Sequence, residues 1–182
     1  MMERNISNSV QSAMRLSASM ANADNHTSYG ISHLVLALLS EGTGTGLSSI
    51  LTAMNKDVGY IQEWFDMRRE MYVSEEHEGD GVVADRQVDL VLEEAERSKI
   101  KLGSDSIDAL CVFTATIRQG VVFSDSQIET LSVSEEDVLS YFNAQEINHS
   151  YQGEENKLLA SYPFAYSLKE ETYILQGKIV LG

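Results

Sequence analysis

Apolar residues recur at helical spacing in separate segments of the chain. In residues 88–100, "VDLVLEEAERSKI", the positions i, i+3, i+4 and i+7 are occupied by Val88, Val91, Leu92 and Ala95, and charged residues fill most positions between them. Residues 9–21, "SVQSAMRLSASMA", show the same stripe at Val10, Ala13, Met14, Ser17 and Ala21. Both patterns predict amphipathic α-helices with one buried face.

A third segment, residues 32–40 ("SHLVLALLS"), is apolar on nearly every side. A buried strand is the alternative, but Leu and Ala outnumber the β-branched residues here, which favours a buried helix. Two further helices are indicated by their starts. Asp57 precedes one apolar stripe, and Ser134 with three acidic residues after it precedes another, as N-cap residues do. The aromatic residues of the first stripe, Trp64 and Phe65, are expected in the core.

The whole pattern occurs twice along the chain. The offset that aligns Val10 with Val88 also aligns Met14 with Leu92, Tyr29 with Ile107, Ala37 with Ala115, Leu39 with Ile117 and Gly42 with Gly120. After the glycines the offset is shorter by one, and it aligns Met54 with Leu131, Ile61 with Val138 and Phe65 with Phe142. The repeat predicts two similar four-helix units, with one residue missing from the inter-helix loop of the second.

The predicted fold is all-α, with two pseudo-symmetric four-helix repeats forming one domain. The first repeat covers residues 1–73 and the second covers residues 86–146. Between them, residues 74–85 begin with "SEEHEGDG" and are expected to form an acidic, solvated linker. Residues 147–182 form a C-terminal tail, either a connecting segment or a hairpin, because its end, "TYILQGKIVLG", alternates about a glycine.

The charge balance narrows the possible partners. The 182 residues include 28 acidic and 13 basic ones, and the formal net charge of −15 repels the phosphates of a nucleic acid. No apolar run is long enough to cross a membrane, and the N-terminus lacks the pattern of a signal peptide. The single cysteine, Cys111, excludes an internal disulfide. We therefore expect a cytoplasmic protein that binds neither nucleic acid nor membrane.

Two stretches carry a resemblance to a known family. Residues 31–42, in which His33 is followed by "LVLALL", resemble the first Clp repeat of Clp-type AAA+ unfoldases, as do the later Ile50 and Leu51. Residues 91–120, "VLEEAERSKIKLGSDSIDALCVFTATIRQG", resemble the second Clp repeat. Where the family has glutamate before histidine, this chain has Ser32 in the first repeat, and a Leu-Cys pair replaces both residues in the second.

The resemblance implies a mobile docking domain that binds protein substrates or adaptors and passes them to a hexameric unfoldase ring. In one branch of the family, the domain recognises a helix on the contractile sheath of type VI secretion systems. The isolated domain is expected to be a monomer without chemistry of its own. No G-x-x-x-x-G-K-[ST] motif occurs, so no cofactor is expected in this chain, and ATP is expected only in an ATPase domain outside it. A free-standing relative that covers or regulates a ring is a further alternative.

The family's peptide-binding groove can be transferred to this chain by aligned position. The resemblance implies that it is lined by Ser7, Val10, Leu92, Ser104, Leu110 and Cys111. The helical register of Cys111 favours a core position, where cysteine behaves as a small apolar residue, over a groove position or a nucleophile.

The glycines at 42, 44 and 46 offer an alternative function of another class. A glycine-rich turn after an apolar segment can hold the phosphates of a nucleotide, which would make the protein an enzyme. These glycines alternate too tightly for a dinucleotide fingerprint, and Asp66 is poorly placed as its acidic residue. The second copy keeps one glycine, Gly120. The pattern favours a flexible turn between helices.

Other polar side chains have a structural interpretation that we favour over a chemical one. His33 lies in an apolar helix without a second histidine nearby, so a core or helix-start role is favoured over a metal ligand. His77 lies among glutamates that could hold a cation weakly, but a solvated linker is favoured. Adjacent carboxylates do not face each other on a helix, which favours a surface role over acid–base catalysis for Glu93, Glu94, Glu135 and Glu136.

Overall fold

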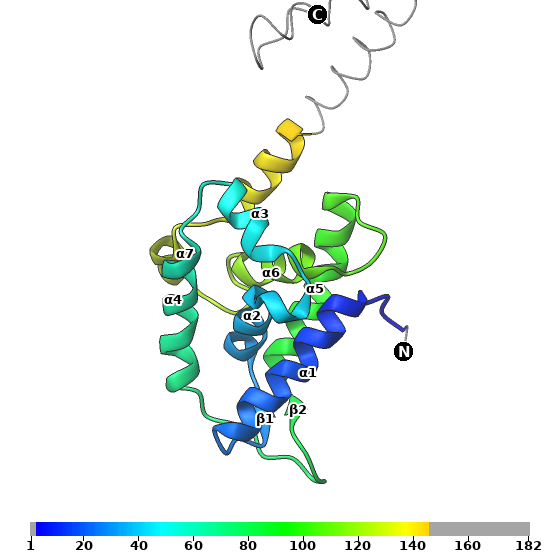
Figure 1. Ribbon diagram of the computed structural model, residues 1–182, viewed down its shortest axis with the longest axis vertical. Helices are drawn as coiled ribbons and strands as arrows, with labels where there is room; N and C mark the ends of the chain where they lie inside the picture. Colours follow the sequence, from blue (N-terminus) through cyan, green and yellow to red (C-terminus); the bar gives the residue numbers. More distant parts are fainter. Residues whose placement is uncertain (1–2, 146–182) are drawn as a thin grey trace, which may run out of the picture. The chain divides into compact units, whose positions relative to one another are not determined.

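The computed structural model describes residues 3–145, and these are mostly helical (Figure 1). The first set of helices is α1 (Asn8–Ala23), α2 (Ile31–Leu39), α3 (Leu47–Ala53) and α4 (Val58–Glu70), with a short 3-10 helix, η1 (Glu41–Thr43). The second set is α5 (Arg86–Leu102), α6 (Ala109–Ile117), α7 (Asp125–Leu131) and the helical residues 135–145. The strands β1 (Ser28–Tyr29) and β2 (Val83–Ala84) are two residues each. The all-α prediction is confirmed.

The chain divides into two compact units, residues 1–139 and residues 140–182. Helices α1 to α7 and both strands belong to the first unit. The predicted tail, residues 147–182, lies outside the described residues. None of the described helices is both long and apolar enough to span a bilayer.

Side-chain caps fix where most of the helices begin. The predicted start at Asp57 is confirmed, because its carboxylate accepts a hydrogen bond from the backbone N–H of Tyr60 at 3.0 Å. At the second predicted start, Ser134 Oγ accepts from the N–H of Asp137, and the Asp137 carboxylate accepts from the N–H of Ser134. This reciprocal pair satisfies two backbone donors that the first helical turn leaves unbonded.

The buried faces follow the predicted stripes. All four apolar positions of the α5 stripe are buried, as are Val10, Ala13, Ser17 and Ala21 of α1, whereas Met14 of the predicted α1 stripe is half-buried. Helix α2 is buried on nearly every side because it packs against both α1 and α4 (Figure 1). Helix α6 is also fully buried, and its main contact is with α5. Trp64 and Phe65 are 6% and 0% exposed, which confirms their predicted place in the core.

Two short parallel strand pairings connect the repeats, and they involve equivalent residues. Ile6, before α1, forms a parallel bridge with Ile107, before α6. Tyr29, before α2, pairs in parallel with Ala84, before α5. The offset between the repeats relates Ile6 to Ala84 and Tyr29 to Ile107. We call residues 5–10 with 104–111 the N-terminal junction, and residues 26–33 with 83–88 the linker junction.

The structure corrects where the repeat loses one residue. The loop was expected to be shorter in the second copy, but the N-caps Gly46 and Ser124 still keep the offset that relates Val10 to Val88. The left-handed residues that follow the two helices, Asn55 (φ 63°) and Ser132 (φ 68°), are the first equivalent pair with the shorter offset. Helices α3 and α7 have seven residues each and keep the longer offset from end to end, so the missing residue lies at the C-terminal end of the third helix, just before the left-handed residue.

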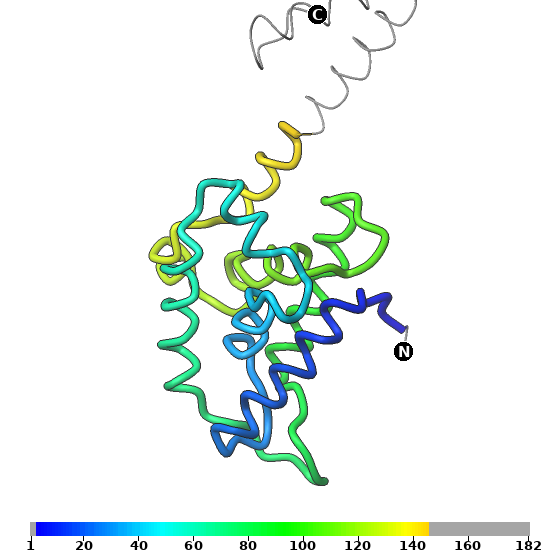
Figure 2. Tube along the Cα trace, in the orientation of Figure 1, coloured from blue at the N-terminus to red at the C-terminus, as the bar shows by residue number. Residues whose placement is uncertain are grey.

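The linker is more closely attached than its acidic composition predicted. Thr27 Oγ1 donates a hydrogen bond to the carbonyl of Glu75, and the N–H of Glu75 donates to Ser28 Oγ. His77 Nε2 lies 2.9 Å from the carbonyl oxygen of Thr27 and 3.0 Å from that of Gly81. Figure 2 shows this segment passing β1 and turning back towards α5. Residues 74–84 are exposed or half-buried, as expected of a solvated linker, but the linker is also hydrogen-bonded to the segment before α2.

Candidate functional site

A groove of about 940 Å³ lies beside the linker junction. One wall is the segment 71–75, which follows α4, and the other is the first two turns of α5, with Arg4 at the edge. We call this cavity the α5 groove. It lies wholly within residues 1–139, so a single compact unit builds it.

Apolar side chains stand exposed on both walls of the α5 groove. Met71 is 71% exposed, Val73 is 83% exposed and Leu90 is 50% exposed. Leu90 lies outside the buried stripe of α5, so the core does not require an apolar residue there. Exposed apolar groups gathered in one concave place are typical of binding surfaces.

The charges of the α5 groove are mainly acidic. Arg86 is offset by Glu75, whose carboxylate lies 3.6 Å from the guanidinium. Asp89 and Glu93 are exposed and one helical turn apart, and neither has an ion-pair partner among the described residues. Two like charges at i, i+4 repel each other. The α5 side of the groove therefore presents uncompensated negative charge next to an apolar side chain.

A buried hydrogen-bond network holds the two walls together. The hydroxyl of Tyr72 donates to the carboxylate of Asp85 at 2.9 Å and lies 2.7 Å from Ser28 Oγ. Asp85 is 5% exposed and also caps α5 by accepting from the N–H of Val88 at 3.0 Å. Burial raises the pKa of Asp85, while these two hydrogen bonds oppose that shift, and burial also raises the pKa of Tyr72. The network fixes the segment after α4 against the start of α5.

Gly30 is needed where this network meets α2. A Cβ atom at this position would lie 2.5 Å from Cε2 of Tyr72 and 3.0 Å from the carboxylate of Asp85. Its φ of −104° is open to any residue, so close approach and not backbone conformation is the reason for glycine. Without a side chain of its own, Gly30 cannot cap α2.

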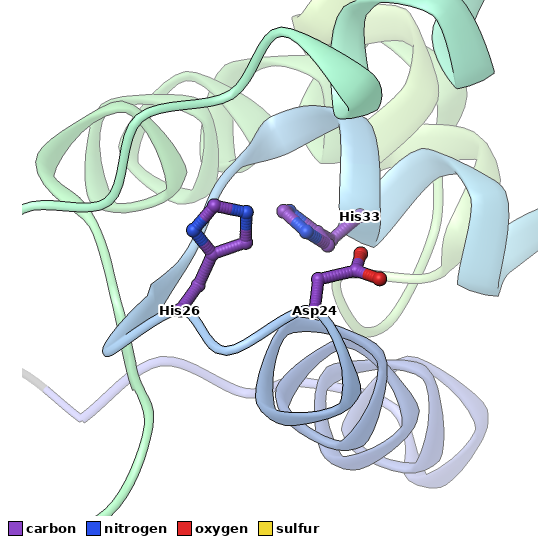
Figure 3. A group of neighbouring side chains, drawn as sticks. All are labelled: Asp24, His26 and His33. Carbon is purple, nitrogen blue, oxygen red and sulfur yellow. The ribbon is translucent and has the colours of Figure 1, made fainter.

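His33 supplies only the reciprocal half of a capping box. Its Nδ1 accepts a hydrogen bond from the N–H of Gly30 at 3.1 Å, and its side chain is fully buried. Figure 3 shows the His33 ring beside His26 and Asp24, and one potential ligand atom from each of the three lies within 4.8 Å of the others. Burial, followed by the nearby His26, lowers the pKa of His33 to about 4, while Asp24 opposes this shift.

These three residues group as a metal site would, yet the helix cap works against one. A neutral imidazole whose Nδ1 accepts a hydrogen bond carries its proton on Nε2, and Nε2 of His33 has no hydrogen-bond partner among the described residues. Binding a metal through Nε2 would move that proton to Nδ1, where it would face the N–H of Gly30. The geometry supports a helix-start role for His33. The expectation that no second histidine lies nearby is wrong, because His26 is 5.9 Å away between ring centroids.

Comparison with known proteins shows the family. Residues 5–126, more than half of the chain, match the Clp repeat (R) N-terminal domain. The chain belongs to the Clp repeat N-terminal domain family. This domain is non-catalytic. No curated protein sequence matches the chain.

Solved Clp N-domains share the fold. The N-terminal domain (1–163) of the ClpV1 ATPase from the E. coli EAEC Sci1 type VI secretion system is 15% identical with a TM-score of 0.60, over 78% of this chain and 85% of that chain. The N-domain of ClpV from Vibrio cholerae is 16% identical with a TM-score of 0.61, over 76% and 82%. The Hsp104 N-terminal domain from Candida albicans is 12% identical with a TM-score of 0.57, over 77% and 89%.

Five of the six groove residues transferred from the Clp repeat family belong to the N-terminal junction, and the sixth, Leu92, lies on α5. The structure buries Val10, Leu92 and Cys111, which are 0%, 2% and 0% exposed, so these side chains have no surface for a partner. Burial raises the pKa of the Cys111 thiol to about 11, as suits a core cysteine and not a nucleophile. Leu110 is buried as well, at 6% exposed, whereas Ser7 and Ser104 are half-buried.

The glycine segment of this Clp repeat domain is a surface turn. Gly44 and Gly46 have φ angles of 70° and 71°, and a Cβ atom at either would meet nothing within 4 Å. Thr43 Oγ1 donates to the carbonyl of Ser40 and Ser48 Oγ donates to that of Leu39, so polar side chains bond to the end of α2. The turn supplies the backbone conformation between two helices, which agrees with the favoured interpretation.

The sequence analysis did not identify the α5 groove as a binding site, although one of its residues carried a usable signal. Leu90 is an apolar residue off the buried stripe, between acidic residues on an otherwise polar face. Met71 and Val73 carried no signal, because they follow the last helical turn of α4 and have no periodic context.

Proposed function

We propose that this domain docks protein substrates or adaptors for a Clp-type AAA+ unfoldase. Membership of the Clp repeat N-terminal domain family supports a role in protein interaction. The observation that carries the proposal is the α5 groove, in which exposed Met71, Val73 and Leu90 stand beside acidic side chains. The parent ring, its ATP and its cytoplasmic location remain predictions.

The groove supplies both kinds of contact that docking needs. Exposed apolar side chains gain about 25 cal/mol for each Å² that a partner removes from water. The negative charge beside them attracts positively charged segments and speeds their encounter.

A second candidate partner is a helix of a type VI secretion sheath protein. It is favoured by the fold shared with the two ClpV N-domains. In this alternative the partner would contact the N-terminal junction, where Ser7 and Ser104 are half-buried.

Peptide binding by the complete 182-residue chain tests the proposal. Arrays of overlapping peptides from unfolded model proteins and from sheath proteins should yield saturable binding for a subset of peptides. ATP and NAD, titrated in parallel, should give no saturable heat signal. An array on which no peptide binds, or saturable nucleotide binding that Gly44→Val abolishes, would contradict the proposed function.

A further inference from the structure

We propose that the α5 groove selects extended polypeptide segments in which a large apolar side chain lies close in sequence to a lysine or arginine. This inference rests on the proposed docking function and names the chemistry of the partner. It also places the contact on the start of α5 and the segment after α4, away from the N-terminal junction.

The preference for an apolar side chain in the partner follows from the exposed apolar side chains of the groove. Leu90 projects from α5 at 50% exposure, and Met71 and Val73 stand opposite it on the other wall at 71% and 83%. These three form an apolar contact surface on both sides of one cavity. Methionine adapts its shape to different side chains, which suits a surface that accepts varied sequences.

The preference for a lysine or arginine in the partner follows from the acidic pair Asp89 and Glu93. Asp89 and Glu93 flank Leu90 on the same side of α5, and no described residue forms an ion pair with either. A cationic side chain placed between the two carboxylates would relieve their mutual repulsion. Of the two cationic groove residues, Arg86 lies 3.6 Å from Glu75, and Arg4 forms no ion pair with any described residue, Asp89 and Glu93 included. The negative charges of Asp89 and Glu93 therefore favour a cationic side chain supplied by the partner.

The other repeat shows that neither feature is required by the fold. The residues of α1 that the repeat offset aligns with Asp89, Leu90 and Glu93 are Gln11, Ser12 and Arg15. The equivalent helix thus keeps the same backbone with no acid pair and no exposed apolar side chain there. The apolar and acidic character belongs to the groove and not to the Clp repeat.

The spacing along α5 sets the spacing in the partner. Leu90 and Glu93 are separated by about 4.5 Å along the helix axis at about 1.5 Å per residue. An extended chain advances about 3.3 Å per residue, and a lysine side chain adds reach of its own. A basic residue within about three positions of the apolar one can therefore reach the carboxylates while the apolar side chain contacts Leu90.

The test uses fluorescence anisotropy with the complete chain and four labelled peptides in one Gly/Ser/Asn background. The first peptide has a Leu-Phe pair followed closely by two lysines. The second has glutamates in place of the lysines, the third has serines in place of Leu-Phe, and the fourth has the lysines moved to the far end. We expect the first peptide to bind at least about tenfold more tightly than each of the others.

Groove variants then locate the binding. Asp89→Lys with Glu93→Lys should weaken the lysine peptide by about tenfold and strengthen the glutamate peptide, because the charges are exchanged. The matched control is Asp125→Lys with Glu129→Lys, an exposed acidic i, i+4 pair on α7 that lies outside the groove and also begins in the first helical turn. Leu90→Asp should abolish the preference for Leu-Phe, whereas Ile100→Asp, at a position 77% exposed on the same helix, should not.

The triple exchange Asp89→Gln, Leu90→Ser and Glu93→Arg gives α5 the residues that the first repeat already uses. We expect it to fold and to lose the selectivity. If peptides bind but show no preference for lysine, or if the groove variants and their controls behave alike, this inference is wrong while the proposed function stands. If no peptide binds at all, both are wrong.

Discussion

The two junctions between the repeats have the same backbone plan and different chemistry. At the N-terminal junction the N–H of Ser7 donates to the carbonyl of Ile107 at 3.0 Å, and at the linker junction the N–H of Asp85 donates to that of Tyr29 at 3.0 Å. The repeat offset relates Ser7 to Asp85 and Tyr29 to Ile107. The backbone contacts are thus the same in the two copies, while the side chains around them differ.

The difference is clearest at the start of the second helix of each repeat. At the N-terminal junction, Asp108 caps α6 by accepting from the N–H of Cys111 at 2.9 Å, and it also accepts from Ser104 Oγ at 3.1 Å. At the linker junction the equivalent residues are Gly30, His33 and His26. His33 there satisfies the N–H of Gly30 from within the helix.

This comparison shows how one close contact alters its surroundings. The ring of Tyr72 occupies the space that a side chain at position 30 would need, so α2 begins without a capping side chain at its N-cap, and His33 satisfies the backbone N–H of Gly30 instead. Tyr72 in turn fixes the segment that forms one wall of the α5 groove. The N-terminal junction has a compact aspartate cap, and the linker junction has a buried polar network next to a binding surface.

The largest effect is expected from Gly30→Ala. The new Cβ would overlap Tyr72 and press on Asp85, which should lower the free energy of unfolding by about 2–3 kcal/mol. Urea denaturation measures the change. Gly59→Ala is the control, because its Cβ would meet only Asp57, at 3.4 Å, and should leave stability unchanged or raise it slightly. Equal effects of the two substitutions would remove the steric reason for Gly30.

A smaller loss is expected from Tyr72→Phe. It removes the hydroxyl that links Ser28 to the buried Asp85 and should cost about 2 kcal/mol, as estimated from two part-buried hydrogen bonds. Tyr60→Phe is a matched control, since Tyr60 is 41% exposed and donates one hydrogen bond, to the carbonyl of Thr130. Peptide binding should weaken in Tyr72→Phe alone. A variant as stable as the parent would show that the network does not hold the groove wall.

The linker junction should also respond to pH. The pKa of His33 is about 4 in the folded chain against an ordinary value of 6.5, so between these values the unfolded chain binds more protons and stability rises with pH. This residue should lower the free energy of unfolding by roughly 1–2 kcal/mol from pH 7 to pH 5.

His33→Gln isolates that contribution. Glutamine can still accept from the N–H of Gly30, as Gln127 does from the N–H of Ser124 in α7. Urea unfolding of both proteins at the two pH values should show a smaller loss in the variant. Identical pH profiles would mean that His33 is not held neutral by burial.

The smallest effect is expected at the N-terminal junction, from Asp108→Ala. It removes the cap of α6 and should cost about 1 kcal/mol, whereas Asp108→Asn keeps an acceptor and should cost less. Thermal unfolding of the two variants measures the difference. A loss as large as that of Gly30→Ala would show that the two junctions are equally constrained.

The helices could be predicted from the sequence because their signals are local. The apolar stripe at Val88, Val91 and Leu92 predicts the buried face of its helix directly. The N-cap residues Asp57 and Ser134 mark where two other helices begin. The repeat then supplied the pairing of the helices, since two copies with the same spacing fold alike.

The candidate site could not be predicted in the same way, because it depends on contacts between distant residues. The bond from Tyr72 to Ser28 spans 44 positions, and the clash that forces glycine at position 30 comes from that same ring. The groove residues transferred by family alignment were misplaced at Val10 and Leu92, which lie on the buried stripes of their own helices. Their burial was readable from periodicity.

The most direct test of the docking surface is an NMR titration of the ¹⁵N-labelled chain with the Leu-Phe-Lys-Lys peptide. The account predicts that amide shifts concentrate at residues 71–75 and at the first two turns of α5, around Leu90. Shifts confined to the N-terminal junction, around Ser7, Ser104 and Leu110, would contradict it and place the partner on the other surface.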